Sequence, residues 1–292
     1  MLQTMGSEKD YSTISPSARS LLLLKGSTNI PYAKEAAALV MSSEASGLPE
    51  RNGDDFGFWA RVLHFENRYW SINQLLGETG AKNILELSSG YSFRGLDIAN
   101  RRPVHYIDTD LDEVVSHKKY LAGLLRKDLP KPEGLLEILP LNALHEKQFR
   151  ETVNRFAAGP VTIVNEGLLM YLETDEKKKV CAIIHDTLKE RGGCWITADI
   201  YIKKEITGIQ IRRSAAELDF IDQHRIEENK FESFESAERF FKEAGFEKLR
   251  EAKVDHSRLS ALPHLIGAAS AEQAEKLGST GRIQATWMLK PC

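Results

Sequence analysis

The stretch NILELSSGYSFRG, residues 83–95, decides the fold that this chain is expected to adopt. Its short apolar run predicts a buried β-strand, and the small residues that follow predict a tight turn leading into a helix. Glu86 lies near the end of the strand, and Ser88 and Gly90 lie in the turn. Small residues let backbone N–H groups approach a ligand at a helix N-terminus. The stretch therefore predicts either a nucleotide-type binding site or a turn that is small only because it is tight.

Two further expected strands end on acidic side chains. Asp108 and Asp110 lie at the end of the second strand, roughly twenty residues after Glu86, where a carboxylate can accept ribose hydroxyls. Glu166 ends the fourth strand, and the carboxyl ends of parallel strands share one ligand-binding crevice. The alternatives are a helix-capping role for Asp110 or Asp112 and a core ion pair between Glu166 and an arginine.

From residue 83 onward, short apolar runs alternate with amphipathic segments, which is typical of parallel strands joined by crossover helices. We therefore predict an α/β fold with a doubly wound, seven-stranded, mostly parallel sheet. The expected strands are Asn83–Ser88, Val104–Asp108, Glu137–Leu141, Val161–Asn165, Cys194–Ile200, Phe246–Val254 and Ile283–Leu289. The expected helices are Phe93–Asn100, Leu111–Leu125, Glu146–Ala157, Asp175–Glu190 and Ser236–Glu243, with Asp175 as a natural N-cap position.

We expect two regions in the chain: an N-terminal helical cap, residues 1–80, and a ligand-binding domain, residues 81–292. The pattern from 15 to 79 is helical, and no linker rich in Pro, Gly or Ser divides the rest. Two connections, 202–232 and 255–282, are longer than a compact sheet requires. We expect residues 202–232 to form a lid, because they combine several isoleucines with Arg212 and Arg213 and so suit a partly apolar, anionic ligand.

The composition is that of an ordinary globular enzyme, with 42% hydrophobic and 28% charged residues. A formal net charge of −3 leaves no basic excess to offset phosphate repulsion, so a nucleic acid partner is not expected. The three cysteines form neither a CxxC pair nor a metal-ligand spacing, which predicts a reducing cytoplasm and no metal site. The sequence shows no signal-peptide pattern and no apolar run of membrane-spanning length, so no membrane partner is expected.

Several blocks resemble the leucine carboxyl methyltransferase family, which includes polyketide-type O-methyltransferases. EGLLMYL at 166–172 is close to the family motif Glu-Gly-Leu-Leu-x-Tyr-Leu, and GFWARV at 57–62 resembles Gly-Tyr-Phe-Ala-Arg-Val. The turn at 85–94 keeps Gly90 and Arg94 of the family pattern but has Ser92 and Phe93 in place of Asp-Thr. The run from residue 106 to 114, followed by Lys118, resembles the segment in which an acidic residue binds ribose.

The resemblance implies a class I methyltransferase that uses S-adenosylmethionine. It implies that Arg61 grips the methionine carboxylate of the cofactor, that Asp110 binds ribose, and that Asn142 lies beside the adenine. The position of Asp108 at a strand end selects that residue for ribose, so both aspartates are kept. The cofactor-binding candidates are Arg61, Glu86, Ser88, Gly90, Asp108, Asp110, Asn142 and Glu166.

The expected reaction is methyl transfer to oxygen, on a carboxylate or hydroxyl of a small molecule or a chain terminus. A methylsulfonium is already an activated electrophile, so the protein mainly aligns the acceptor and excludes water. A carboxylate acceptor needs no base, and no catalytic residue is assigned. A phenol or alcohol would need a base, for which the candidates are His64, His185, His224, Tyr201 and Asp199.

Two other functions remain open. A nicotinamide-dependent oxidoreductase would also use a strand, a turn and an acidic strand end, although Ser88, Gly90 and Phe93 fit its GxGxxG pattern poorly. A binding protein that kept the cofactor pocket without transferring a methyl group is the second alternative.

Overall fold

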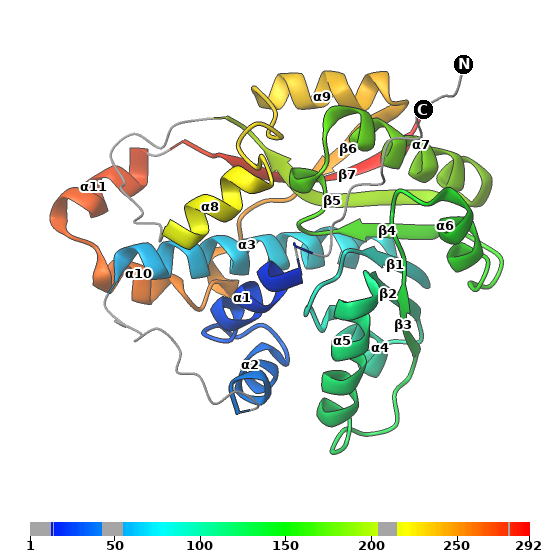
Figure 1. Ribbon diagram of the computed structural model, residues 1–292, viewed down its shortest axis with the longest axis horizontal. Coiled ribbons are helices and arrows are strands. Elements are labelled where there is room, and N and C mark those ends of the chain that lie inside the picture. The colour runs from blue at the N-terminus through cyan, green and yellow to red at the C-terminus, as the bar shows by residue number, and fades with distance from the viewer. Residues whose placement is uncertain (1–12, 14, 43–54, 204–214, 280) are drawn as a thin grey trace.

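The computed structural model describes residues 13, 15–42, 55–203, 215–279 and 281–292, and within them the chain forms a seven-stranded sheet flanked by helices (Figure 1). The strands are β1 (Asn83–Leu87), β2 (His105–Asp110), β3 (Leu135–Pro140), β4 (Val161–Asn165), β5 (Gly193–Tyr201), β6 (Phe246–Glu251) and β7 (Gln284–Pro291). The α-helices are α1 (Ser15–Lys25), α2 (Ala33–Ser42), α3 (Phe56–Thr79), α4 (Arg94–Arg101), α5 (Asp112–Leu125), α6 (Glu146–Val153), α7 (Thr174–Arg191), α8 (Ala215–Gln223), α9 (Phe234–Glu243), α10 (Leu262–Ala268) and α11 (Ala271–Ser279). Two short 3₁₀ turns are η2 (Leu169–Tyr171) and η3 (His256–Arg258).

The strand order is β3-β2-β1-β4-β5-β7-β6. The pairs among β1 to β5 are all parallel, whereas β7 runs antiparallel to both β5 and β6. The order reverses at β1, from which the chain first extends to β3 and then returns through β4. Such a switch point opens a crevice at the carboxyl ends of the strands. The predicted α/β fold class, a doubly wound and mostly parallel sheet of seven strands, is confirmed.

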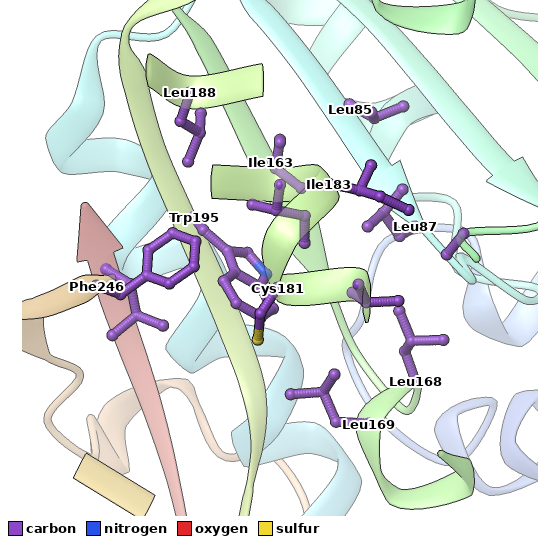
Figure 2. Close-up of a cluster of buried hydrophobic side chains, with 14 of the residues drawn as sticks. Leu85, Leu87, Ile163, Leu168, Leu169, Cys181, Ile183, Leu188, Trp195 and Phe246 are labelled. Atoms are coloured by element: carbon purple, nitrogen blue, oxygen red, sulfur yellow. The ribbon is translucent and has the colours of Figure 1, made fainter. Parts of the chain in front are cut away.

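Alternate side chains of each central strand enter two different cores, because successive side chains of a strand point to opposite faces. In β1, Ile84 packs with residues of α3 and α4, whereas Leu85 packs with residues of α6 and α7. Figure 2 shows the second of these cores, in which Trp195 of β5 lies among aliphatic side chains. Both faces of the sheet are therefore covered by helices, as a largely parallel sheet requires.

Two local expectations were wrong. The second strand does not end at Asp108 but continues to Asp110, because Asp110 pairs with Pro140 of β3. Helix α7 does not begin at Asp175. It is capped by Glu173, whose side chain accepts from the N3 backbone while Glu176 accepts from the Glu173 N–H at 2.9 Å. These two reciprocal hydrogen bonds give partners to backbone N–H groups at the start of α7 that would lack them if the helix began at Asp175.

The N-terminal helices divide between two positions. Helix α3 packs directly on the sheet through Ile72 and Leu75, so residues 56–79 belong to one of the layers that flank the sheet. Helix α1 lies against α3 and α2, and α2 also packs against α5 (Figure 1). In the region expected to be a lid, α8 and the segment after it are described. Arg212 and Arg213, with half of its isoleucines, lie outside the described residues.

The long connection before β7 is attached to α3 by a buried carboxylate. Glu66 accepts from the N–H and hydroxyl of Ser260, at 2.9 and 2.5 Å, and from the N–H of Ala261 at 2.9 Å. The Ser260 hydroxyl also accepts from the Asn29 N–H at 3.0 Å. Three segments far apart in sequence thus meet at Glu66. None of the helices that the structure describes is long and apolar enough to cross a bilayer.

Candidate functional site

The turn after β1 has an unusual backbone. Ser88 and Gly90 both have φ of 49°, in the left-handed region, where a non-glycine residue such as Ser88 is uncommon. Hydrogen bonds hold this shape, because the Ser89 N–H donates to the Thr109 carbonyl at 2.9 Å and the Gly90 N–H donates to Asp110 Oδ2 at 2.7 Å. A left-handed serine held in this way marks the turn as a candidate functional element.

A cavity lies at the carboxyl ends of β1, β2, β3 and β4, and one face of α1 covers it. Five of the predicted site residues line it, which are Ser88, Gly90, Asp110, Asn142 and Glu166. They come from four separate segments of the chain. The structure therefore brings together most of the predicted cofactor set. Whether these side chains bind a cofactor stays a prediction.

Glu166 is the most heavily paired carboxylate of the cavity. It accepts from Lys25 Nζ at 2.6 Å, from Arg94 Nη2 at 2.9 Å and from Arg68 Nη2 at 3.4 Å, and all these side chains are buried. Burial raises the pKa of Glu166, but the three cations outweigh burial and hold this pKa well below its ordinary value. The core ion pair with an arginine, which was the alternative for Glu166, is thus present, and the same carboxylate also lines the cavity.

Glu86 lies behind the cavity and is not part of its lining. It is fully buried, where it pairs with Arg94 and accepts from the Tyr106 hydroxyl at 2.6 Å. Arg94 therefore bridges Glu86 and Glu166, and its Nε also donates to Asn73 at 2.8 Å. Glu86 thus pairs with an arginine outside the cavity lining, and its predicted contact with the cofactor stays a prediction.

The two aspartates of β2 differ in position. Asp110 lines the cavity, and burial raises its pKa although the N–H groups of Gly90 and Leu111 oppose that rise. Asp108 points elsewhere, into a buried pocket where Lys118 Nζ lies 3.0 Å from its Oδ2. Burial raises the pKa of Asp108 to about 7, while Lys118 lowers it. Of the two, only Asp110 lines the cavity, and the predicted binding of a ribose by either aspartate stays a prediction.

Arg61 is not among the residues that line the cavity. It pairs with Glu217 of α8 and is partly exposed. Arg61 lies about two helical turns before Arg68 on α3, so Arg68 reaches Glu166 and Arg61 does not. The structure thus places Arg61 outside the cavity lining, and its predicted contact with a cofactor carboxylate stays a prediction.

Neither Arg68 nor Lys25 is among the site residues predicted from the sequence. One signal for Lys25 was available: it directly follows the aliphatic run 21–24, so its stem enters the core. Arg68 gave no such signal. Among the described residues, no group of three His, Cys, Asp or Glu side chains is arranged to hold a metal ion.

Asp199 organises the turn after β4 instead of serving as a base. It accepts from the N–H groups of Gly167, Leu168 and Leu169, at 2.6 to 3.0 Å, and from Asn165 Nδ2 at 2.6 Å. Both oxygens of Asp199 are therefore occupied by donors of the β4 strand end and of the turn that follows it. Through these bonds Asp199 fixes the backbone that presents Glu166 to the cavity.

Two of the other candidate bases form a pair beside this cluster. His64 Nε2 lies 2.7 Å from the Tyr201 hydroxyl, which also accepts from Arg68 Nη1 at 2.8 Å. Burial and Arg68 lower the pKa of His64 to about 3, and burial raises the pKa of Tyr201 to about 12. Neither group is therefore suited to accept a proton near neutral pH.

The remaining two candidate bases have other surroundings. His185 lies on α7 against Phe246, and His224 packs against Phe220 and Tyr171. Neither histidine is among the residues that line the cavity.

No protein-family model matches this sequence, and no curated protein matches it. Among solved structures, the cyclopropane synthase MmaA2 from Mycobacterium tuberculosis is similar, at 14% identity and a TM-score of 0.47, over 76% of this chain and 83% of that one. The mitomycin 7-O-methyltransferase MmcR is similar at 13% identity and a TM-score of 0.45, over 90% of this chain and 69% of that one.

A third solved structure, LepI in complex with SAH and a substrate analogue, has 10% identity and a TM-score of 0.45. The match covers 73% of this chain, which spans only 43% of the length of that one. These are distant likenesses, and we take the function from the geometry of the cavity.

Proposed function

We propose that this chain binds S-adenosylmethionine in the cavity at the carboxyl ends of β1 to β4 and transfers its methyl group to an oxygen of a small-molecule acceptor. One observation carries the proposal: the left-handed turn at Ser88–Gly90, the carboxylate of Asp110 and the carboxylate of Glu166 face the same cavity. A strand-turn-helix next to an acidic strand end is the arrangement that binds the nucleoside part of such a cofactor.

Several parts of this cofactor have candidate partners among the residues that line the cavity. Asp110 can accept the ribose hydroxyls, and Asn142 offers both a donor and an acceptor to an adenine ring. Gly90 lies beside Ala18 of α1 and has φ of 49°, a backbone conformation that glycine adopts without strain. The ammonium of Lys25, which lines the cavity, is the cation we assign to the cofactor carboxylate.

When bound, the cofactor supplies the activated methyl group. The protein then has to orient the acceptor and exclude water. Of the candidate bases, His64 and Tyr201 have unsuitable pKa values and Asp199 is saturated with donors. An acceptor that is already ionised, such as a carboxylate, needs no base. We therefore favour methyl-ester formation over methylation of a neutral hydroxyl.

Calorimetric titration with S-adenosylhomocysteine tests the proposal, with NAD as a comparison ligand. We expect binding in the micromolar range and no heat with NAD. Asp110→Asn should weaken this binding by roughly 10- to 100-fold, the scale of a hydrogen bond to a charged group. Asp112→Asn, an exposed neighbour, is the matched control and should bind normally. No heat at millimolar S-adenosylhomocysteine would refute the proposal, as would preferential binding of NAD.

A further inference from the structure

A buried ion pair lies directly beneath the turn after β1. Lys118 of α5 and Asp108 of β2 have side chains that are 0% and 1% exposed, and Lys118 Nζ lies 3.0 Å from Asp108 Oδ2. The same ammonium donates to the Ser89 hydroxyl at 2.8 Å. Lys118 thus connects Asp108 of β2 with Ser89 of the turn. Ser89 is also one of the residues that line the cavity.

Ser89 makes two hydrogen bonds that fix its position, and Lys118 is the partner in one of them. The Ser89 N–H donates to the Thr109 carbonyl, which ties the backbone to β2, while the Ser89 side chain is tied through Lys118. In the described part of the chain, neither oxygen of Asp108 accepts a well-directed hydrogen bond. The main group that offsets the cost of burying this carboxylate is therefore the nearby ammonium of Lys118. A buried carboxylate in that position depends on its partner.

We propose that Asp108 and Lys118 are positioning residues, whose ion pair holds Ser89 and thereby keeps the turn in the shape that binds the cofactor. The inference rests on the proposed function, because it assumes that the cavity holds S-adenosylmethionine. It assigns a role to Asp108 that differs from ribose binding, since this carboxylate acts through Lys118 and does not reach the cavity.

The groups around Asp108 determine how the pair responds to pH. Lys118 from α5 and Arg94 from α4 favour the ionised carboxylate, whereas Glu86 from β1 and burial oppose it. Tyr106, on the same strand, also interacts with the Asp108 charge. Because burial dominates, the pKa of Asp108 is raised to about 7. Asp108 is thus ionised above this pH and neutral below it.

The sign of the effect follows from the charge of Asp108. Above about pH 7 the ionised carboxylate holds the ammonium between itself and Ser89, so the turn is fixed and cofactor affinity is high. Below that pH the carboxyl group is neutral, and the ammonium loses its counter-charge and its fixed position. Cofactor affinity should therefore fall as pH falls from 8 to 6, by at most about tenfold per pH unit for one proton.

The first experiment measures the dissociation constant of S-adenosylhomocysteine by calorimetry between pH 6 and 8.5. The wild-type constant should rise as pH falls below about 7. Asp108→Asn should bind at least about fivefold more weakly than wild type at pH 8, and its constant should no longer vary with pH. Asp112→Asn, whose exposed acid begins α5, should keep the wild-type profile.

Two other groups lie near the turn, and one of them, His117, is changed in the same series. His117 contacts the Tyr91 hydroxyl at 2.9 Å, and Asp110 lines the cavity. His117→Gln should keep the wild-type pH profile. If Asp108→Asn also keeps that profile, the pH dependence belongs to another group, such as Asp110, and the inference is overturned.

The second experiment removes the ammonium. Lys118→Met should weaken binding at pH 8 to the level of Asp108→Asn, whereas Lys119→Met, the exposed neighbour on α5, should not. Lys118→Arg keeps the charge and should recover part of the affinity. If Lys118→Met does not fold, the double variant Asp108→Asn with Lys118→Met removes both buried charges and should be equally weak and independent of pH.

The outcomes separate this inference from the proposed function. Wild type that binds no S-adenosylhomocysteine at any pH overturns both. Wild type that binds, with variants of Asp108 and Lys118 that bind equally well at every pH, leaves the cofactor proposal standing and overturns the positioning role.

Discussion

Glu166 forms buried ion pairs in the core and also lines the cavity. Three cations pair with its carboxylate, but of these Lys25 alone also lines the cavity. Arg94 is engaged by Glu86 and Asn73, and Arg68 is engaged by Tyr201. Burial lowers the pKa of Lys25, while Glu166 opposes that effect, so the pair depends on both partners. Among these three cations, Lys25 thus has the best access to a ligand.

We therefore expect Lys25→Met to weaken S-adenosylhomocysteine binding by roughly 10- to 100-fold, because a charged hydrogen bond to the cofactor carboxylate is lost. Arg61→Met should change the affinity by less than about twofold, since Arg61 pairs with Glu217 outside the cavity. Calorimetry on the two variants shows whether Lys25 or Arg61 binds the cofactor carboxylate. The reverse ranking would restore Arg61 as the carboxylate anchor.

At the scale of elements, the turn from β4 into η2 depends on the strand beside it. β4 and β5 are parallel neighbours, and Asp199 of β5 receives the backbone N–H groups that follow β4. Trp195, on the same strand, donates to Asn165 Oδ1 at 2.6 Å, so the final residue of β4 is held as well. The position of Glu166 is thus fixed by β4, by the turn that follows β4, and by Asp199 and Trp195 of the neighbouring strand β5.

Asp199→Asn should destabilise the protein by about 1.5–3 kcal/mol, because an amide cannot replace a carboxylate that accepts several N–H donors. Urea unfolding at pH 7 measures this loss. Asp175→Asn, with a side chain that is 98% exposed, should change the unfolding free energy by less than about 0.5 kcal/mol. Equal stabilities for the two variants would show that the turn does not depend on Asp199.

At the scale of the whole molecule, buried carboxylates link stability to pH. The pKa of Glu166 is held far below its ordinary value of 4.5 by Lys25, Arg68 and Arg94. A depressed carboxyl pKa contributes stability that is fully present above the unfolded-state value and is lost as pH falls toward the folded-state value. Between pH 7 and about 5 this contribution is therefore constant, and it declines in stronger acid.

Glu166→Gln removes this contribution, so the variant should be less stable than wild type at pH 7. The difference between the two unfolding free energies should shrink as pH falls below about 4.5, because wild type then loses what the variant already lacks. Urea unfolding at several pH values from 7 to 3 provides the comparison. Glu243→Gln, an exposed residue at the end of α9, should follow wild type throughout. A difference that stays constant down to pH 3 would contradict this linkage.

Most of the strands could be predicted because they contain short apolar runs, which are a local property of the sequence, whereas β6 is rich in charged residues. The end of β2 could not be predicted in this way, because it depends on the pairing of Asp110 with Pro140 of β3. These two residues are separated in the sequence by the crossover helix α5. Arg68 was missed for a similar reason: its partners Glu166 and Tyr201 lie 98 and 133 residues further along the chain. The predicted carboxylates of the cavity could be named from strand ends, but the cations that surround them depend on tertiary packing.

The position of β7 has a consequence for how the protein is made. β7 lies between β5 and β6, so β6 has no strand to pair with until β7 is in place. During synthesis, residues 246–251 leave the ribosome before residues 284–291, and the edge of β5 stays open meanwhile. An open edge strand can pair with another chain. Nascent chains that stall between these two segments should therefore be the species most prone to aggregate and most dependent on chaperones.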